Sequence, residues 1–86
     1  MSDNYERLRL IFTEVLGLPA DRDPSTAAAG EAWNWDSLAH VSLVAAMESE
    51  FGVSIDVDRS LTMTSFSSAA GTLRDLGVEF GSGEVA

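Results

Sequence analysis

The tetrapeptide Trp35-Asp36-Ser37-Leu38 places a hydroxyl at the predicted first turn of a helix, directly after an acidic loop. The first N–H groups of a helix have no partners within it, and the helix dipole is positive at that end. Such a terminus favours a phosphate attached to the hydroxyl. Asp36 is well placed as the helix N-cap, and an ordinary capped helix start is the alternative interpretation of these residues.

His40 follows Ser37 by three residues, so both side chains lie on one face of the predicted helix and could form a nucleophile and its base. A serine hydrolase also needs an oxyanion hole and a pocket, and the sequence lacks the Gly-x-Ser-x-Gly elbow that usually builds them. We therefore expect no catalytic residue, and a structural or partner-contacting role for His40.

No metal site is predicted. The chain has no cysteine, which excludes thiolate ligands and disulfides. The segment 56–60 resembles the start of a calcium loop, but Leu61 stands at the required glycine and Ser67 at the bidentate acid.

A first amphipathic helix is predicted from Tyr5 to Leu16, because its apolar residues recur at steps of three and four. Gly17 and Pro19 end it, and residues 17–36 form a long loop without a clear period. A loop of this length must pack against the domain or carry function, and Leu18 and Trp33 are the side chains expected to anchor it.

Further helices are predicted after this loop, at Ser37–Phe51, Arg59–Met63 and Phe66–Leu76. Gly52 ends the first of them, and Ser65 caps the last. The segment Ser37–Phe51 carries an expected apolar stripe of Leu38, Val41, Val44, Ala45 and Met47. Val53 and Ile55 are interpreted as core-filling loop residues, since two apolar residues without a partner strand make no sheet. The fold class expected is an all-α, three- to four-helix bundle.

Eighty-six residues predict one domain spanning 1–86, with a core of about 4–80 and a frayed tail at 81–86. Fourteen acidic side chains against five basic ones, a net charge of −9, disfavour nucleic acids and membranes as partners. The same charge favours enzymes with basic patches, or it only keeps the domain soluble. Without a signal peptide or a membrane-length apolar run, the chain is expected to be cytoplasmic. It is also expected to be a monomer.

The surroundings of Ser37 resemble the acyl carrier protein family, in which the serine of an Asp-Ser-Leu motif begins the second helix of a four-helix bundle. The resemblance covers roughly residues 5–80 and is carried by the segments 36–43, 48–55, Leu61-Thr62 and Ser65-Phe66. It implies that a phosphopantetheinyl transferase attaches 4′-phosphopantetheine to Ser37, and that the terminal thiol carries an acyl group as a thioester. The chain is then a carrier and not an enzyme, and Asp36 serves as helix cap and transferase contact.

Contacts with partner enzymes are expected from Glu48 and Glu50, with Asp56 and Asp58 extending the acidic surface, although each is equally consistent with a solvated face. Leu38, Val41 and Trp35 are the apolar candidates for partner contact. For Trp33 and Trp35, cover for the core is the favoured alternative.

The sequence departs from fatty acid carriers, which usually have a glutamate where Ser42 stands, and it lacks the Gly-Gly that precedes the serine in peptidyl carriers. A discrete carrier for polyketide or other secondary-metabolite assembly is therefore expected. The alternatives are a carrier for fatty acid synthesis and an unmodified, acidic helical module that binds one protein partner.

Overall fold

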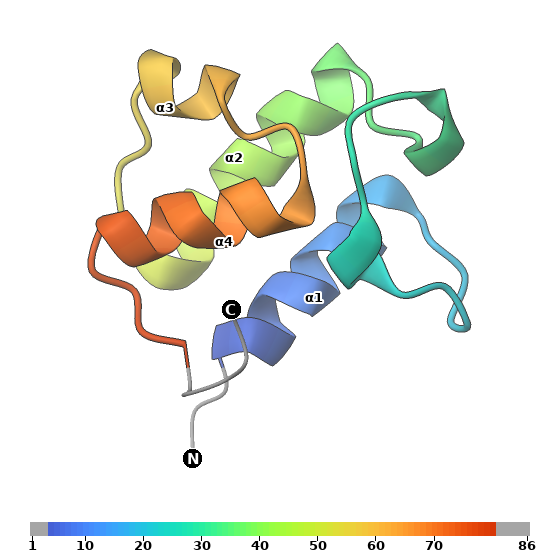
Figure 1. Ribbon diagram of the computed structural model, residues 1–86, viewed down its shortest axis with the longest axis horizontal. Coiled ribbons are helices and arrows are strands. Elements are labelled where there is room, and N and C mark those ends of the chain that lie inside the picture. Colours follow the sequence, from blue (N-terminus) through green and yellow to red (C-terminus); the bar gives the residue numbers. More distant parts are fainter. Residues whose placement is uncertain (1–3, 81–86) are drawn as a thin grey trace.

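A computed structural model describes residues 4–80 of the chain. Within these residues the chain forms four α-helices and two short 3₁₀ helices, arranged as in Figure 1. Their order is α1 (Asn4–Leu16), η1 (Pro24–Thr26), η2 (Glu31–Trp33), α2 (Ser37–Phe51), α3 (Val57–Leu61) and α4 (Phe66–Asp75). The expected all-α class and the long loop after the first helix are confirmed.

The helix ends follow local capping signals. Asp36 accepts a hydrogen bond from Ala39 N–H at 2.9 Å, and Gly52 ends α2 in the left-handed region with φ of 65°. Ser65 caps α4 and forms a reciprocal capping box with Ser68. These observations confirm the predicted bounds of α2 and the start of α4.

The third helix lies two residues earlier than predicted, at Val57–Leu61 instead of Arg59–Met63. The reason is its N-cap, because the Asp56 carboxylate accepts a hydrogen bond from Arg59 N–H at 2.7 Å. Met63, expected to end this helix, lies beyond it and is fully buried.

The hydrophobic core lies between α1, α2 and α4, with loop residues completing it. Phe12 of α1 meets Trp35 edge-to-face at 5.3 Å between ring centroids and Phe66 at 5.0 Å. The largest fully buried side chains are Phe12, Leu8, Leu43, Met47, Met63 and Leu73.

The predicted apolar stripe of α2 is wrong in part. Met47 is buried as expected, but Leu38 and Val41 are 76% and 65% exposed, and Leu43 lies in the core instead. Apolar residues occur on every side of this helix, so the sequence alone does not determine which face packs against α1.

The loop 17–36 packs against the bundle, which is one of the two outcomes expected for an irregular segment of this length. Leu18 is buried, and Trp33 packs on the edge of the core with the Arg22 guanidinium 3.7 Å from its ring centroid. Ala29 N–H donates to Thr64 O, and Phe66 N–H donates to Ala27 O, each at 2.9 Å. These two bonds join the loop to the segment that precedes α4.

Val53 and Ile55 lie outside any strand, and Ile55 is buried, as predicted for loop residues that fill the core. The tail at 81–86, expected to fray, lies outside the described residues. Among the helices between residues 4 and 80, none has the length and apolar content needed to cross a membrane.

Candidate functional site

Ser37 is the first residue of α2 and its side chain is exposed. The N–H groups of Ser37 and Leu38 lie in the first turn, and within residues 4–80 neither has a hydrogen-bond acceptor. The hydroxyl therefore stands in solvent at a helix end that offers two unpaired donors and a positive dipole.

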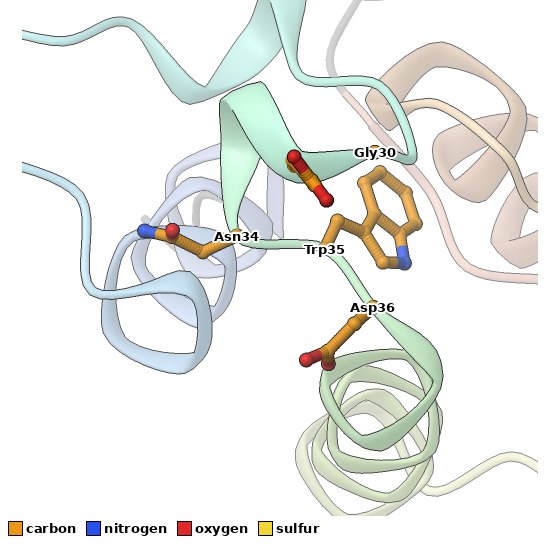
Figure 2. Close-up of a pocket in the computed structure, with 5 residues that line it drawn as sticks. Gly30, Asn34, Trp35 and Asp36 are labelled. Carbon is orange, nitrogen blue, oxygen red and sulfur yellow. The ribbon is translucent and has the colours of Figure 1, made fainter.

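Asp36 immediately precedes α2 and caps its first turn. Its backbone is extended and its carboxylate is directed to the first turn of α2, as Figure 2 shows for the segment from Gly30 to Asp36. One carboxylate oxygen accepts from Ala39 N–H, so the predicted capping role is confirmed. Because Asp36 is exposed, solvent screens its repulsion of a phosphate on the neighbouring serine.

Behind this helix start, Trp35 is buried, with 3% of its surface exposed. Its Nε1–H donates to Nδ1 of His40 at 3.1 Å, and the two rings stack with centroids 6.1 Å apart. The burial of Trp35 corrects its assignment as a partner contact, since the side chain covers the core, the alternative that the sequence favoured.

His40 uses both ring nitrogens. Because Nδ1 accepts from the indole, which can only donate, the ring proton lies on Nε2, and Nε2–H donates to Ser60 O at 2.8 Å. No ring nitrogen remains to accept a proton from Ser37. The structure thus gives His40 a structural role, and the serine-hydrolase arrangement does not form.

An apolar groove of about 560 Å³ opens beside Ser37, between the first turns of α2 and the segment 60–64. Val41, Leu61 and Met63 line it, together with Trp35 and His40. A group attached to Ser37 can therefore lie against apolar surface without entering the core.

A smaller hollow of about 380 Å³ lies on the loop side of Asp36, and Figure 2 shows the residues around it. Asn34 adopts a left-handed conformation there, with φ of 56°, and its amide donates to Leu16 O at 3.0 Å. Glu31 and Asp36 both line the hollow, so it disfavours an anion. The bond from Asn34 to Leu16 O anchors the turn that leads into α2.

The family described as Phosphopantetheine attachment site matches residues 6–77, most of the chain. The chain belongs to this family of carrier proteins. No solved structure matches it. The carrier is not itself a catalyst: it holds 4′-phosphopantetheine on a serine, and this group supplies the terminal thiol that a chain without cysteine cannot provide.

The start of α2 fits such a group. An exposed hydroxyl, two unpaired N–H donors and an adjacent apolar groove are what a phosphodiester with a long organic chain requires. In this carrier, Ser37 and Leu38 would hold the phosphate, while Asp36 keeps the first turn of α2 in place.

The acidic residues expected to meet partners also make contacts within the carrier. Glu48 accepts a hydrogen bond from Ile55 N–H at 2.6 Å, and Glu50 forms an ion pair with Arg7 at 3.0 Å. Asp56 caps α3, and Asp58 lies exposed in its first turn. In the described part of the chain, no group of three acidic or histidine side chains is placed to hold a metal.

Sequence reasoning missed two apolar residues near the site. Val57 and Leu61 of α3 are 72% and 69% exposed, and Leu61 lines the groove together with Val41. The signal was the Asp56 N-cap, which starts α3 early enough to include Val57.

Proposed function

We propose that Ser37 is the attachment serine, and that the carrier presents acyl thioesters to the enzymes of a polyketide or other secondary-metabolite pathway. The observation that carries this proposal is the exposed Ser37 hydroxyl at the first residue of α2, beside two N–H groups without acceptors. A transferase can reach this oxygen, and the helix end stabilises the phosphate that results.

Other serines near helix starts support the choice by contrast. Ser65 and Ser68 bond each other in the capping box of α4, and Ser60 donates to Val57 O at 2.8 Å. Ser67 is the nearest rival, because it is exposed in the first turn of α4. It has no Asp-Ser-Leu context and does not line the groove beside Ser37.

The pathway proposal rests on α2. Ser42, where fatty acid carriers usually have a glutamate, is exposed on this helix, which lowers the negative charge that a partner meets. Fatty acid synthesis remains the alternative pathway. The cytoplasmic location and the monomeric state remain predictions.

For the partner surface we propose the apolar patch, defined as the exposed side chains of Leu38, Val41, Val57 and Leu61. Val41 lines one hollow with Leu61 and another with Val57, and Asp36 and Asp58 lie close to Leu38 and Val57 in the sequence. Exposed apolar side chains gain free energy when a partner covers them, and the carboxylates attract basic residues at its rim. The partners are the phosphopantetheinyl transferase and the acyl-loading and acyl-processing enzymes. Glu48 and Glu50 are proposed as weaker contacts, because each already has an internal partner.

The test is the intact mass after incubation with a broad-range phosphopantetheinyl transferase and coenzyme A. The wild type and Ser67→Ala are each expected to gain one phosphopantetheine, and Ser37→Ala is expected to gain none. Peptide mapping should place the added mass on the peptide that contains Ser37. An unmodified wild type across several transferases, or full modification of Ser37→Ala, would refute the proposal.

A further inference from the structure

Helix α3 has little packing of its own. None of its five residues is buried, and the buried side chains on either side of it are Ile55 and Met63. Figure 1 shows α3 at the edge of the bundle, on the side away from α1. Among residues 4–80, the bond from His40 Nε2 to Ser60 O, at 2.8 Å, is the only hydrogen bond that joins α2 to α3. The position of α3 on α2 therefore depends strongly on one side chain.

The other end of the His40 ring is fixed in the core. Its Nδ1 accepts from Trp35 Nε1–H at 3.1 Å, and Trp35 is buried against Phe12. A continuous path of contacts thus runs from the core through the imidazole to the last turn of α3. The carbonyl that receives the bond belongs to the C-terminal end of this short helix, where a side-chain donor stabilises the helix.

The bond joins the two halves of the apolar patch. His40 directly precedes Val41 on α2, and Ser60 directly precedes Leu61 on α3. The carbonyl that His40 holds is therefore part of the peptide group that links Ser60 to Leu61. Val41 and Leu61 line the same hollow. The α2 half of the patch keeps its place because α2 packs on α1, whereas the α3 half needs an external support.

We propose that His40 is a positioning residue for docking, and that through the Ser60 carbonyl it holds the α3 half of the patch where the phosphopantetheinyl transferase meets it together with the α2 half. This inference rests on the proposed function, both the attachment at Ser37 and the apolar patch as partner surface. A patch that is held in place before binding spares the complex the cost of ordering α3. His40 touches no reacting atom, and its effect reaches the transferase through Leu61.

The expected signature is a rise in KM without a fall in kcat. Because the patch lies outside the reacting atoms, it should bind the transferase equally in the ground state and the transition state, and its loss leaves the transfer to Ser37 unchanged. A well-positioned leucine in an interface contributes about tenfold in affinity, and one on an unpositioned helix contributes little. The effect of Leu61 should therefore depend on His40, and the effect of Leu38 should not.

Two substitutions separate the two bonds of His40. In His40→Asn, the short amide is expected to keep an acceptor for Trp35 Nε1–H without reaching Ser60 O. In His40→Gln, the longer amide can bond both groups. Asparagine and histidine have similar helix propensities, so His40→Asn alters little else in α2. Ser49→Asn, at an exposed position of the same helix, is the matched control and should leave KM unchanged.

The experiment measures initial rates of phosphopantetheinylation at saturating coenzyme A, with the concentration of the carrier varied. Leu61→Ala and Leu38→Ala are each made in the wild type, in His40→Asn and in His40→Gln. In the wild type each should raise KM about tenfold, and His40→Asn alone should do the same. Within His40→Asn, Leu61→Ala should add less than about twofold, whereas Leu38→Ala should keep its full effect. His40→Gln should behave as the wild type does.

A measurement on the wild type keeps the test decisive if His40→Asn folds poorly. His40 is the only histidine of the chain, so a nitrogen-15 spectrum contains the signals of one imidazole. These signals should show the proton on Nε2, which donates to Ser60 O. Backbone relaxation should show α3 to be as ordered as α2, with order parameters of about 0.85.

The inference is overturned by an equal effect of Leu61→Ala in the wild type and in a folded His40→Asn protein. It is also overturned by a proton on Nδ1 of His40, or by order parameters below about 0.6 for α3 in the wild type. Each of these outcomes leaves the proposed function intact. Failure of the proposed function looks different, because a wild type that gains no mass refutes the attachment. An unchanged KM for both Leu38→Ala and Leu61→Ala in the wild type refutes the patch.

Discussion

Trp35 and His40 are joined by a hydrogen bond of 3.1 Å that spans the residue proposed to carry the prosthetic group. Trp35 precedes Ser37 by two residues and is packed on Phe12, whereas His40 follows Ser37 by three and reaches α3. The hydroxyl of Ser37 is thus exposed, while the backbone on either side of it is fixed to the core. This arrangement presents a mobile attachment from a rigid base, which suits a group that must visit several enzymes.

Trp35→Phe tests this bond. The ring of phenylalanine can still pack on Phe12, but Nδ1 of His40 loses its donor and the smaller ring leaves a cavity, so the free energy of unfolding should fall by more than the roughly 1 kcal/mol of the bond alone. Urea unfolding followed by circular dichroism measures the change. Trp33→Phe is the control, since Trp33 is partly exposed and the Arg22 guanidinium can lie over either ring. Equal losses in both variants would contradict the importance of the bond.

Substitutions of Asp36 separate its two roles. Asp36→Ala removes the acceptor for Ala39 N–H and should lower the free energy of unfolding by about 1 kcal/mol, whereas Asp36→Asn should lower it by only a few tenths. Both remove the charge, so both should slow phosphopantetheinylation, by about fivefold if the transferase contact resembles an exposed ion pair. Normal modification of Asp36→Asn would leave Asp36 with the capping role alone.

The sequence was sufficient for features that depend on neighbouring residues. The bounds of α2 follow from Asp36 and Gly52, and the start of α4 follows from Ser65. The 3₁₀ helix η1 also has a local signal in the sequence, although no helix was predicted there. Asp23 caps it and Pro24 occupies its first position.

Features that depend on packing between distant segments were not accessible in this way. The buried face of α2 could not be chosen, because Leu38 and Leu43 are equally apolar and only the approach of α1 selects Leu43. The bond between His40 and Ser60 joins residues that are 20 positions apart in the sequence, so no local sequence pattern predicts it. The groove beside Ser37 depends on that same placement of α3.

Glu48 is expected to hold the turn between α2 and α3. In Glu48→Ala the Ile55 N–H loses a charged acceptor at 2.6 Å, and the free energy of unfolding should fall by about 1.5 kcal/mol. Glu48→Gln keeps an acceptor oxygen and should recover most of this loss. Ser49→Ala, at an exposed position one residue further along α2, serves as the control for substitution in this helix. An unchanged unfolding curve for Glu48→Ala would show that the bond adds nothing.

Asp23 gives a pH dependence with a defined sign. Hydrogen bonds from the backbone and hydroxyl of Ser25, and then from Arg9, hold the pKa of Asp23 below its ordinary value of 3.8. A carboxyl with a lowered pKa contributes stability above its unfolded pKa and loses it as the pH falls through the folded one. The stability difference between the wild type and Asp23→Asn should therefore be present at pH 7 and shrink below about pH 4. Urea unfolding of both proteins at pH 7 and below about pH 4 measures this stability difference. A difference that does not depend on pH would contradict this account.

The apolar patch is expected to serve binding and not folding. Leu38→Glu replaces an exposed leucine, so the free energy of unfolding should change by no more than about 0.5 kcal/mol. The rate of phosphopantetheinylation should fall about tenfold or more, because an apolar contact is lost and a charge must be desolvated against the partner. Leu10→Glu is the matched control, since Leu10 is an exposed leucine of α1, and its modification rate should equal that of the wild type. Equal slowing by both substitutions would mean that added negative charge alone impairs the transferase, and the patch would then have no special part in docking.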